Sequence, residues 1–488
     1  MTRFTALVCI LLTASISVAG DWPQFRGPNC TGISTDARPL PTTFSDTENV
    51  TWSADLGDGI GCPVVAAGRV ITSAVVNETH IGLYAYDMTS GKKLWERLWP
   101  IGDIDEIHKS NSYAATTAAA DSERVYFYFW TLGLVAVDAR TGADVWHKEL
   151  PIPYFVFKWG AGMSPVLYKD MVLFCQDDDL YPAFYAFDRK TGRQIWKDDR
   201  NDMAVNYSHP VICSTDHGDE IVVGGTGLLV GYDPKTGKRL WQARTLLRNI
   251  KTTPVAHGDT IYISLQSGGI ANQWLASVDR AETGNNDDKL TRDEVQAFVG
   301  KRKVPYAFFQ KTFGRGDLDK DGDLEGEELD IAFLHGDNFA GASYDAENPA
   351  QEYILAVKAG GRGDVTDTHV LWKKPTKHTD HIVSPLVIND RMLLIKCGGI
   401  ATCFQAGNGE QVFGPARIRN EGDYFASPIY GDGKVYAASE NGRIVVMKEG
   451  PEPDVLAVND MGDSILGTPA IADGALFVRT RSKLLRLD

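Results

Sequence analysis

The chain has 488 residues, of which 43% are hydrophobic and 23% are charged, a composition typical of a folded globular protein and not of a disordered one. Its formal net charge is −15 at pH 7. This charge argues against nucleic acid or an anionic membrane surface as a partner, because both are polyanions that would repel the protein.

Residues 1–19 have the pattern of a signal peptide. A basic start at Arg3 is followed by an apolar run and by small residues that end at Ala19. The pattern predicts export to the periplasm or the extracellular space. The run is too short to span a membrane, and no other stretch is long and apolar enough. We interpret residues 20–48 as an N-terminal extension. In an oxidising compartment Cys30 and Cys62 are candidates for a disulfide, with buried free thiols as the alternative.

The main feature of the sequence is an internal repeat. A hydrophobic strand, an Asp, a Thr/Ser-Gly turn and a Trp eight residues after the Asp recur at steps of about 50 residues, which indicates one supersecondary unit copied around an array. Alternating apolar residues predict half-buried strands, and a Trp at a fixed place suits packing against the next unit. The four clear copies are Leu83–Trp95, Leu134–Trp146, Phe184–Trp196 and Leu229–Trp241.

Weaker copies extend the array to eight units. They are Tyr353–Trp372, Ile400–Phe413 and Ile444–Leu456. The last unit stops at Asp488 without a fourth strand, whereas Asn49–Leu56 has the composition of an outer strand and carries Trp52. We therefore predict an all-β fold, an eight-bladed β-propeller formed by residues 49–271 and 344–488. Its ring is closed by the N-terminal strand, because open sheet edges invite aggregation.

Residues 272–343 interrupt the repeat with charged, helix-compatible sequence. Positions 317–328 match the twelve-residue calcium loop of an EF-hand: Gly322 permits the sharp bend and Leu324 is expected to pair with a partner loop. The alternative is a solvated acidic loop. The predicted Ca²⁺ ligands are Asp317, Asp319, Asp321, Asp323, Glu325 and Glu328.

A degraded partner loop precedes it. If Leu290 is position eight, Thr283 is position one and Asp288 stands where a Gly belongs. Helical spacing of apolar residues then predicts a small helical EF-hand pair. The candidate ligands of this loop are Asn285, Asp287, Lys289 and Glu294, and the apolar positions are Trp274, Leu275, Val278, Val295, Phe298, Val299, Tyr306, Phe309 and Phe313.

Loops that join successive blades carry polar residues that are candidates for a ligand site. Each residue taken alone fits a loop cap or a solvated side chain, but together they predict a site on the propeller face for a protein, a peptide or a polar small molecule. The candidates are His108, Lys109, Asn111, His209, His381 and Tyr424, accompanied by Lys158, Trp159, Asn206, Tyr207, Lys251, Asp380 and Asp423.

The repeats resemble the tryptophan-docking motifs of the pyrroloquinoline-quinone (PQQ) dehydrogenase superfamily, and the compact size resembles the propeller of the outer-membrane assembly machinery. Three segments are most similar to secreted bacterial PQQ-like repeat propellers: Asp21–Pro28, His108–Ala114 and Arg479–Thr480. The resemblance covers nearly the whole chain outside the leader and the insert. It implies the propeller fold, whereas most members of this family have no established reaction.

The resemblance also raises quinone chemistry. The dehydrogenases of the superfamily use a catalytic Asp, a Ca²⁺ held by Glu and Asn beside the quinone, a Trp floor and often a disulfide of adjacent cysteines. No adjacent cysteines occur here, and no Asp, Glu or Asn matches those roles by motif. PQQ is therefore unsupported. The sequence favours an exported calcium-binding interaction scaffold, with a PQQ-dependent dehydrogenase and an extracellular glycan-acting hydrolase as the alternatives.

Overall fold

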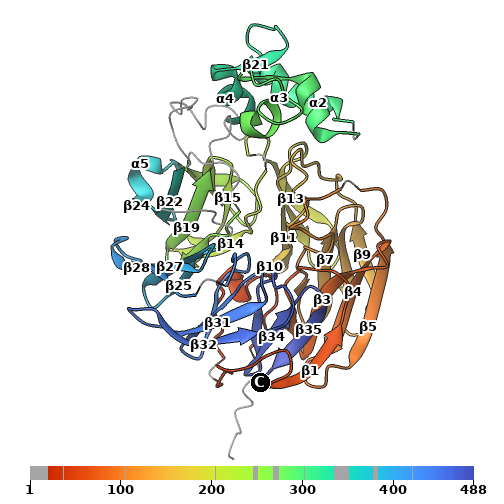
Figure 1. Cartoon of the computed structure of the whole chain (residues 1–488), viewed down its shortest axis with the longest axis vertical. Coiled ribbons are helices and arrows are strands. Elements are labelled where there is room, and N and C mark those ends of the chain that lie inside the picture. Colours follow the sequence, from red (N-terminus) through yellow and green to blue (C-terminus); the bar gives the residue numbers. More distant parts are fainter. Residues whose placement is uncertain are drawn as a thin grey trace, which may run out of the picture.

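The computed structural model describes residues 20–36, 38–104, 106–203, 205–245, 251–267, 274–301, 303–334, 351–376, 383–419 and 421–488. Eight sheets of four or five strands form the blades, and the sequence colours in Figure 1 run once around the ring that these sheets make. The predicted eight-bladed β-propeller is confirmed. The predicted signal peptide lies outside the described residues. Within the part of the chain described, no helix is long and apolar enough to span a membrane.

Blades one to four follow one another along the chain. Blade four has a fifth strand, β23, which runs parallel to β17. Blade one consists of β2 (Val64–Ala66), β3 (Arg69–Val76), β4 (His80–Asp87) and β5 (Lys93–Pro100), and blade two of β6 (Ala119–Ala120), β7 (Arg124–Phe129), β8 (Gly133–Asp138) and β9 (Asp144–Lys148). Blade three consists of β10 (Val166–Tyr168), β11 (Met171–Gln176), β12 (Ala183–Asp188) and β13 (Gln194–Asp199). Blade four consists of β14 (Val211–Thr215), β15 (Gly218–Gly225), β16 (Leu228–Tyr232) and β17 (Arg239–Arg244), together with β23.

Blades five to eight complete the ring. Blade five consists of β18 (Val255–His257), β19 (Thr260–Ser267), β22 (Gln351–Lys358) and β24 (Val370–Pro375), and β23 (Gly363–Asp364) and α5 (Thr366–His369) precede β24 in the chain. Blade six consists of β25 (Leu386–Ile388), β26 (Arg391–Lys396), β27 (Ile400–Gln405) and β28 (Gln411–Arg417), and blade seven of β29 (Ile429–Gly431), β30 (Lys434–Ala438), β31 (Arg443–Lys448) and β32 (Asp454–Asp460). Blade eight consists of β33 (Ala470–Ala472), β34 (Ala475–Arg479), β35 (Lys483–Leu487) and β1 (Val50–Asp55).

The two ends of the propeller meet in blade eight. Strand β1 pairs antiparallel with β35, so that Trp52 lies opposite Arg486. The prediction that Asn49–Leu56 supplies the missing outer strand is confirmed. Pairing of the first strand with β35 gives blade eight its fourth strand and covers the edge that β35 would otherwise expose.

Neighbouring blades are joined by the repeated Trp. The indole nitrogen of Trp95 in blade one donates a hydrogen bond of 2.9 Å to the carbonyl of Ala139, in the turn of blade two. A Cβ built on Gly142 of that turn lies only 2.8 Å from the Trp95 ring, and Gly142 has φ +71°. The motif therefore needs both residues, since the Gly turn makes room for the Trp of the preceding blade. The equivalent bonds join Trp52 to Met88, Trp146 to Arg189, Trp196 to Pro234 and Trp372 to Ala406.

A second set of bonds links the inner strands around the axis. In seven of the eight blades the opening residue donates its backbone N–H to the hydroxyl or thiol of the next opening residue, as from Cys62 to Thr117 at 3.0 Å. The last link closes the ring, from Thr468 N–H to Cys62 Sγ at 3.1 Å. We call this set the hydroxyl ring: Cys62, Thr117, Ser164, His209, Thr253, Ser384, Ser427 and Thr468. His209 is the one member without a hydroxyl or thiol.

Residues 21–34, which we call the N-terminal plug, lie across the inner strands. Trp22 pairs with Val65 of blade one. Asn29 exchanges two hydrogen bonds with the backbone of Ile212 in blade four, and Ile33 pairs with Tyr430 of blade seven. The sequence alone indicates only an N-terminal extension in this part of the chain. The structure shows a segment that ties opposite sides of the ring together and includes the short helix η1 (Pro28–Cys30).

The Cys30–Cys62 disulfide does not form, and the six described cysteines are free. Both thiols are buried but have different neighbours. Cys30 lies in the plug and its thiol faces Gln24 and the carbonyl of Pro210, whereas Cys62 belongs to the hydroxyl ring. Burial raises the pKa of Cys30 to about 12, which keeps it a neutral thiol.

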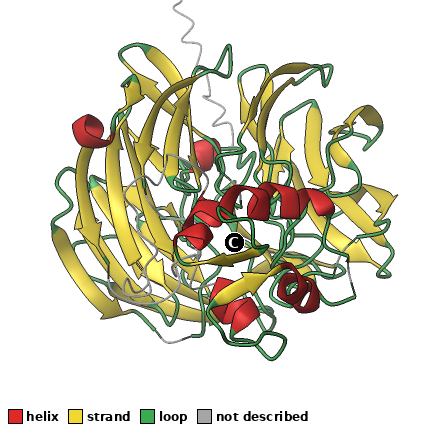
Figure 2. Cartoon of the chain, turned by 90° about the horizontal axis from the view of Figure 1, so that it is seen from above, coloured by secondary structure: helices red, strands yellow, loops and turns green. Residues whose placement is uncertain are grey.

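The helical insert leaves the ring between β19 and β22 of blade five. It contains η2 (Leu275–Asp279), β20 (Lys289–Thr291), α2 (Arg292–Val299), α3 (Tyr306–Gly316), β21 (Asp323–Glu325) and α4 (Glu327–Leu334). Figures 1 and 2 show the helices outside the sheets, on one side of the ring. The expectation that Tyr306 is part of the apolar face is wrong, because α3 begins at this residue and leaves it 69% exposed. Phe308 takes the buried place.

Gly142→Ala tests the packing between blades. The new methyl group collides with Trp95 and stands at a positive φ, so we expect the free energy of unfolding to fall by about 2–4 kcal/mol. Denaturant unfolding measures the change. Gly258→Ala is the matched control: its φ is +60° but nothing lies within 4 Å of the added Cβ. Equal destabilisation by both variants would contradict a role for the indole contact.

Candidate functional site

The two loops of the insert lie side by side. Strands β20 and β21 pair antiparallel, with Leu290 opposite Leu324. The pairing expected for Leu324 is thus observed. Both leucines are fully buried, so the short ribbon fixes the spacing of the two acidic loops.

The 317–328 loop gathers its first three carboxylates. One oxygen of each of Asp317, Asp319 and Asp321 lies within 4.8 Å of the others. Asp319 accepts the Asp321 N–H at 3.1 Å, and Gly322 has φ +95°, which provides the expected bend. Asp317 Oδ1 is buried without a hydrogen-bond partner in the structure. A cation would supply the missing partner.

The closing residue of this loop faces inward. Glu328 accepts the Leu318 N–H at 2.7 Å through Oε1 and the Glu325 N–H at 3.3 Å through Oε2, so its carboxylate spans the loop. Burial and the charge of Asp321 raise the pKa of Asp323. This mutual repulsion is what a divalent cation relieves. The residues of the loop fit Ca²⁺, which prefers several carboxylate and carbonyl oxygens.

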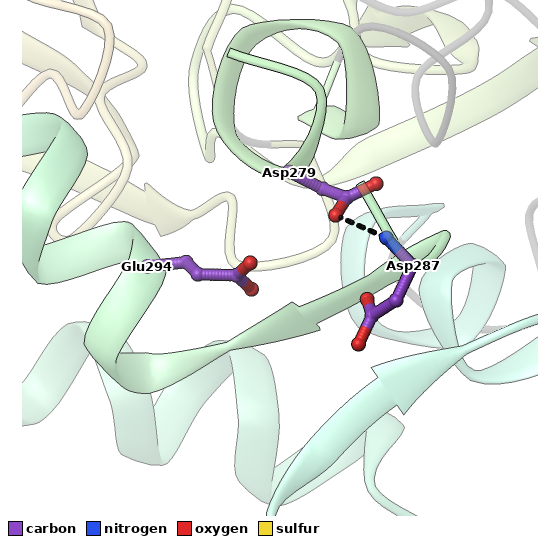
Figure 3. Close-up of side chains that lie close together, drawn as sticks. All are labelled: Asp279, Asp287 and Glu294. Carbon is purple, nitrogen blue, oxygen red and sulfur yellow. Dashed lines mark hydrogen bonds between the residues drawn. The ribbon is translucent and has the colours of Figure 1, made fainter. Parts of the chain in front are cut away.

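The preceding loop has a different first residue from the one that the sequence indicated. Thr283 is exposed, and Asp279, at the end of η2, takes the first place. Asp279 accepts the N–H groups of Asp287 at 3.0 Å and Asp288 at 3.1 Å. Figure 3 shows its carboxylate beside Asp287 and Glu294, with which it forms the second acidic group. The loop is longer than the twelve-residue template, which is why counting back from Leu290 missed Asp279.

The remaining candidate ligands of this loop have other contacts. Asn285 donates to Asp287 Oδ2 at 3.0 Å, and Lys289 forms an ion pair of 2.5 Å with Glu325 of the other loop. Glu294 caps α2, because it accepts the backbone N–H of Thr291 at 2.9 Å. In the sequence, the one indication that Asp279 belongs to this loop is its position as an acidic residue at the end of an apolar helical run.

The insert is fastened to blade three. Its core includes three propeller residues, Tyr154, Val156 and Leu180. The ring of Phe308 lies 5.8 Å from that of Tyr154, and Phe157 lies 4.7 Å from Trp274. Lys311 Nζ donates to the Leu180 carbonyl at 3.3 Å. The insert therefore bridges blade five, from which it emerges, to blade three. We call residues 151–160 the platform loop.

Buried carboxylates hold this platform. Asp177 forms a fully buried ion pair of 2.9 Å with Arg200, and Asp179 accepts the Val156 N–H at 2.9 Å. Asp178 accepts the N–H groups of Leu180 and Tyr181, and burial raises its pKa to about 6. All three acids thus serve as loop anchors. This arrangement differs from the pair of carboxylates flanking an open cleft that a glycan hydrolase needs.

Several predicted loop residues do come together, around Trp159. The rings of His108 and Trp159 pack at a tilt of 44° with their centroids 4.7 Å apart, and Asn111 Nδ2 donates to the Trp159 carbonyl at 2.6 Å. Lys251 Nζ lies 5.9 Å from the Trp159 ring centroid. The backbone carbonyl of Lys158 accepts the His108 N–H at 2.7 Å. We call Trp159 and these four residues the Trp159 patch.

The other candidates lie elsewhere. Lys109 is exposed next to the patch. His209 and Tyr424 are buried, so they do not share the exposed face. His209 belongs to the hydroxyl ring, where burial lowers its pKa to about 3, and Tyr424 packs against Gly399. His381 and Asp380 lie outside the described residues.

The structure also bears on the quinone. In the described ranges, both groups of three or more acidic, His or Cys residues able to share a metal lie in the insert, at Asp279 and at Asp317. The channel side of the inner strands is crossed by the plug, with Trp22 and Arg26 fully buried. Among the described residues, a group of three such side chains is therefore found in the insert and not beside the channel.

Comparisons with known proteins agree with this fold. No curated protein matches the chain. BamB from Moraxella catarrhalis is 12% identical, with 90% of this chain and 96% of that chain covered and a TM-score of 0.52. Saccharomyces cerevisiae Sqt1 is 9% identical over 90% and 99%, also with a TM-score of 0.52. A europium-containing methanol dehydrogenase is 12% identical over 94% and 89%, with a TM-score of 0.49.

At these identities the structural likeness shows the fold alone. The family model is more specific: the one described as "Outer membrane protein assembly factor BamB" matches residues 34–154 and 157–305, which is more than half of the chain. The chain therefore belongs to this family of PQQ-type repeat propellers.

Proposed function

We propose that this chain is an exported, calcium-binding β-propeller that acts as an interaction scaffold and binds a segment of another protein at the Trp159 patch. The patch is the observation that carries the proposal. Trp159 is 36% exposed and is held by His108 and Asn111, while Lys251 adds a positive charge. A rigid aromatic anchor with a polar rim is the typical centre of a protein interface.

Three further apolar side chains are exposed near the docking site of the insert. Ile152, Tyr181 and Tyr306 are 52%, 46% and 69% exposed. Each is close in the chain to a residue that docks the insert, namely Tyr154, Leu180 or Phe308. An aromatic surface next to lysines favours a peptide that carries both apolar and acidic residues. The family description, an assembly factor, is in keeping with a role in holding other proteins.

Calcium is the second part of the proposal. Asp317, Asp319, Asp321 and Glu328 supply carboxylates, and the buried Asp317 Oδ1 needs a partner. Asp279, Asp287 and Glu294 form the weaker second site. Since the insert shares its core with the platform loop, ions bound there stabilise the loop that carries Trp159.

Glu328→Gln tests the calcium sites. Changes to outer-shell groups alone cost about 10–100-fold in metal affinity, so removal of a bidentate ligand should weaken Ca²⁺ binding to the 317–328 loop by about 100-fold or more. Titration calorimetry should show two ions for the wild type and one for this variant, and one also for Asp279→Asn. Glu327→Gln removes the same charge from an exposed neighbour and should bind like the wild type. Unchanged affinity of Glu328→Gln would refute the site, and the β-rich circular dichroism should stay constant throughout.

Trp159→Ala tests the partner site. Peptides selected on the immobilised protein from a random phage-displayed library should be rich in apolar and acidic residues. Their affinity should fall about 10-fold or more in Trp159→Ala, as expected for an interface anchor worth 1.4 kcal/mol or so. Leu371→Ala, which truncates a 50% exposed side chain on the outer strand of blade five, is the control. Selected peptides that bind both variants equally would place the interaction elsewhere.

Incubation with PQQ separates the scaffold from a quinoprotein. The described residues lack an acidic calcium site beside the channel, so we expect PQQ added with Ca²⁺ to separate from the protein on gel filtration. The protein fraction should then show no quinone absorbance. A stoichiometric quinone spectrum in that fraction would overturn the scaffold and make the chain a quinoprotein.

A further inference from the structure

The N-terminal plug carries a charged side chain into the interior of the ring. Arg26 is 0% exposed. Its Nη2 donates to the carbonyls of Pro385 at 2.6 Å and Thr31 at 3.3 Å. Its Nε and Nη1 are buried and have no hydrogen-bond partner in the structure. The guanidinium therefore has unused N–H donors and no carboxylate partner among the described residues.

Neighbours from three sides of the ring place this guanidinium near the axis. Pro385 follows Ser384 of the hydroxyl ring in blade six. Cys62 of blade one lies close enough to affect the pKa of Arg26, which burial lowers to about 10. His209 of blade four feels the charge of Arg26 in turn. Only a position inside the channel is close to all three blades.

His209 adds another unused donor at this place. Its ring stacks on Phe25 of the plug at 4.3 Å, and its Nδ1 lies 3.0 Å from Thr253 Oγ1. That oxygen accepts the His209 backbone N–H and has its own hydrogen to donate to Nδ1; the anion proposed below requires this tautomer, in which the ring hydrogen is on Nε2. Nε2 is buried without a partner. The low pKa, caused first by burial and then by Arg26, keeps the ring neutral.

Two donor nitrogens of Arg26, the unpartnered Nε2 of His209 and a buried positive charge thus belong to the place where the plug packs, through Phe25, on the one member of the hydroxyl ring without a hydroxyl. A water molecule satisfies donors but leaves the charge uncompensated, and a buried ion without a counter-charge is strongly unfavourable. We propose that the channel holds a small monovalent anion, a halide or a carboxylate of formate size, bound by Nε and Nη1 of Arg26 and by Nε2 of His209. The anion joins the plug to the inner strands and keeps this side of the channel closed.

Bromide is the direct probe, because its anomalous scattering identifies it. Crystals of the wild-type protein soaked in bromide should show a peak within hydrogen-bond distance of Arg26 Nε or Nη1. If the site accepts a carboxylate as well as a halide, formate added to the bromide soak should displace the bromide and remove this peak. Density for water only at this position, under conditions that give bromide peaks elsewhere, would overturn the proposal.

Thermal unfolding in solution gives the second measurement. Chloride or bromide is varied at constant ionic strength against gluconate, which is too large for the channel. Linkage predicts that the Tm of a chain of this length rises by about 1–2 °C per tenfold increase in halide above its Kd. Arg26→Gln should abolish this slope. Arg140→Gln, which removes an exposed arginine from the turn of blade two, should retain it.

Equal slopes in the wild type and Arg26→Gln would show that halide acts elsewhere and would refute the site. If Arg26→Gln does not fold, the bromide peak in the wild-type crystal decides the question alone. The readouts do not involve calcium or peptides, so this inference stands or falls independently of the proposed scaffold function.

Discussion

Contact between consecutive blades is the constraint on which this structure depends. Each blade packs only against its two neighbours, so the ring is stable only when every interface, including the last, is made. The chain repeats one solution: a Trp that reaches the turn of the next blade, and a Gly that makes room for it, as at Trp95 and Gly142. Around the axis the hydroxyl ring repeats a second link at every blade but one. Strand β1 supplies the final interface from the other end of the chain.

Departures from the repeat follow the same physical rule. The docking Trp is replaced by Phe413 in blade six, whose neighbour, blade seven, has no Gly four residues after Lys448. A pocket lined by Phe413, Lys448 and Glu449 remains at this interface. Trp241 is retained, but the longer connection in blade five offers no Thr-Gly turn, and the indole donates instead to Glu220 at 2.7 Å. Glu220 also accepts the Gly360 N–H, so it replaces the missing turn as the link between blades four and five.

The insert packs directly against the loop that carries the proposed partner site. Phe157 of the platform loop contacts Trp274 and Phe298 of the insert, and Trp159 follows two residues later. Asp179 holds the same loop through the Val156 N–H. Under the proposed function, ordering of the acidic loops by calcium would act, through packed side chains, on the backbone that presents the Trp159 patch. At the plug, in contrast, the group without a counter-charge is the Arg26 guanidinium, which is positive. The acidic loops of the insert therefore suit a cation, whereas the plug suits an anion.

The sequence alone determined the elements whose signals are local. The Asp-to-Trp spacing predicted the blades, Trp52 predicted the closing strand, and Leu324 with Gly322 predicted the paired acidic loops, because periodicity and turn chemistry need only near neighbours in the chain. Tertiary structure alone decided the rest. Asp279 entered its loop because the turn is longer than the template, and Tyr306 lost its buried place because α3 begins there. Cys30 lies in the plug and is not bonded to Cys62, His209 is buried in the hydroxyl ring, and Arg26 is buried near the axis. The outcomes for the cysteines, His209 and Arg26 depend on contacts between segments far apart in the chain, whose positions become defined only when the eight blades close, whereas those for Asp279 and Tyr306 depend on the exact length of one turn and the start of one helix.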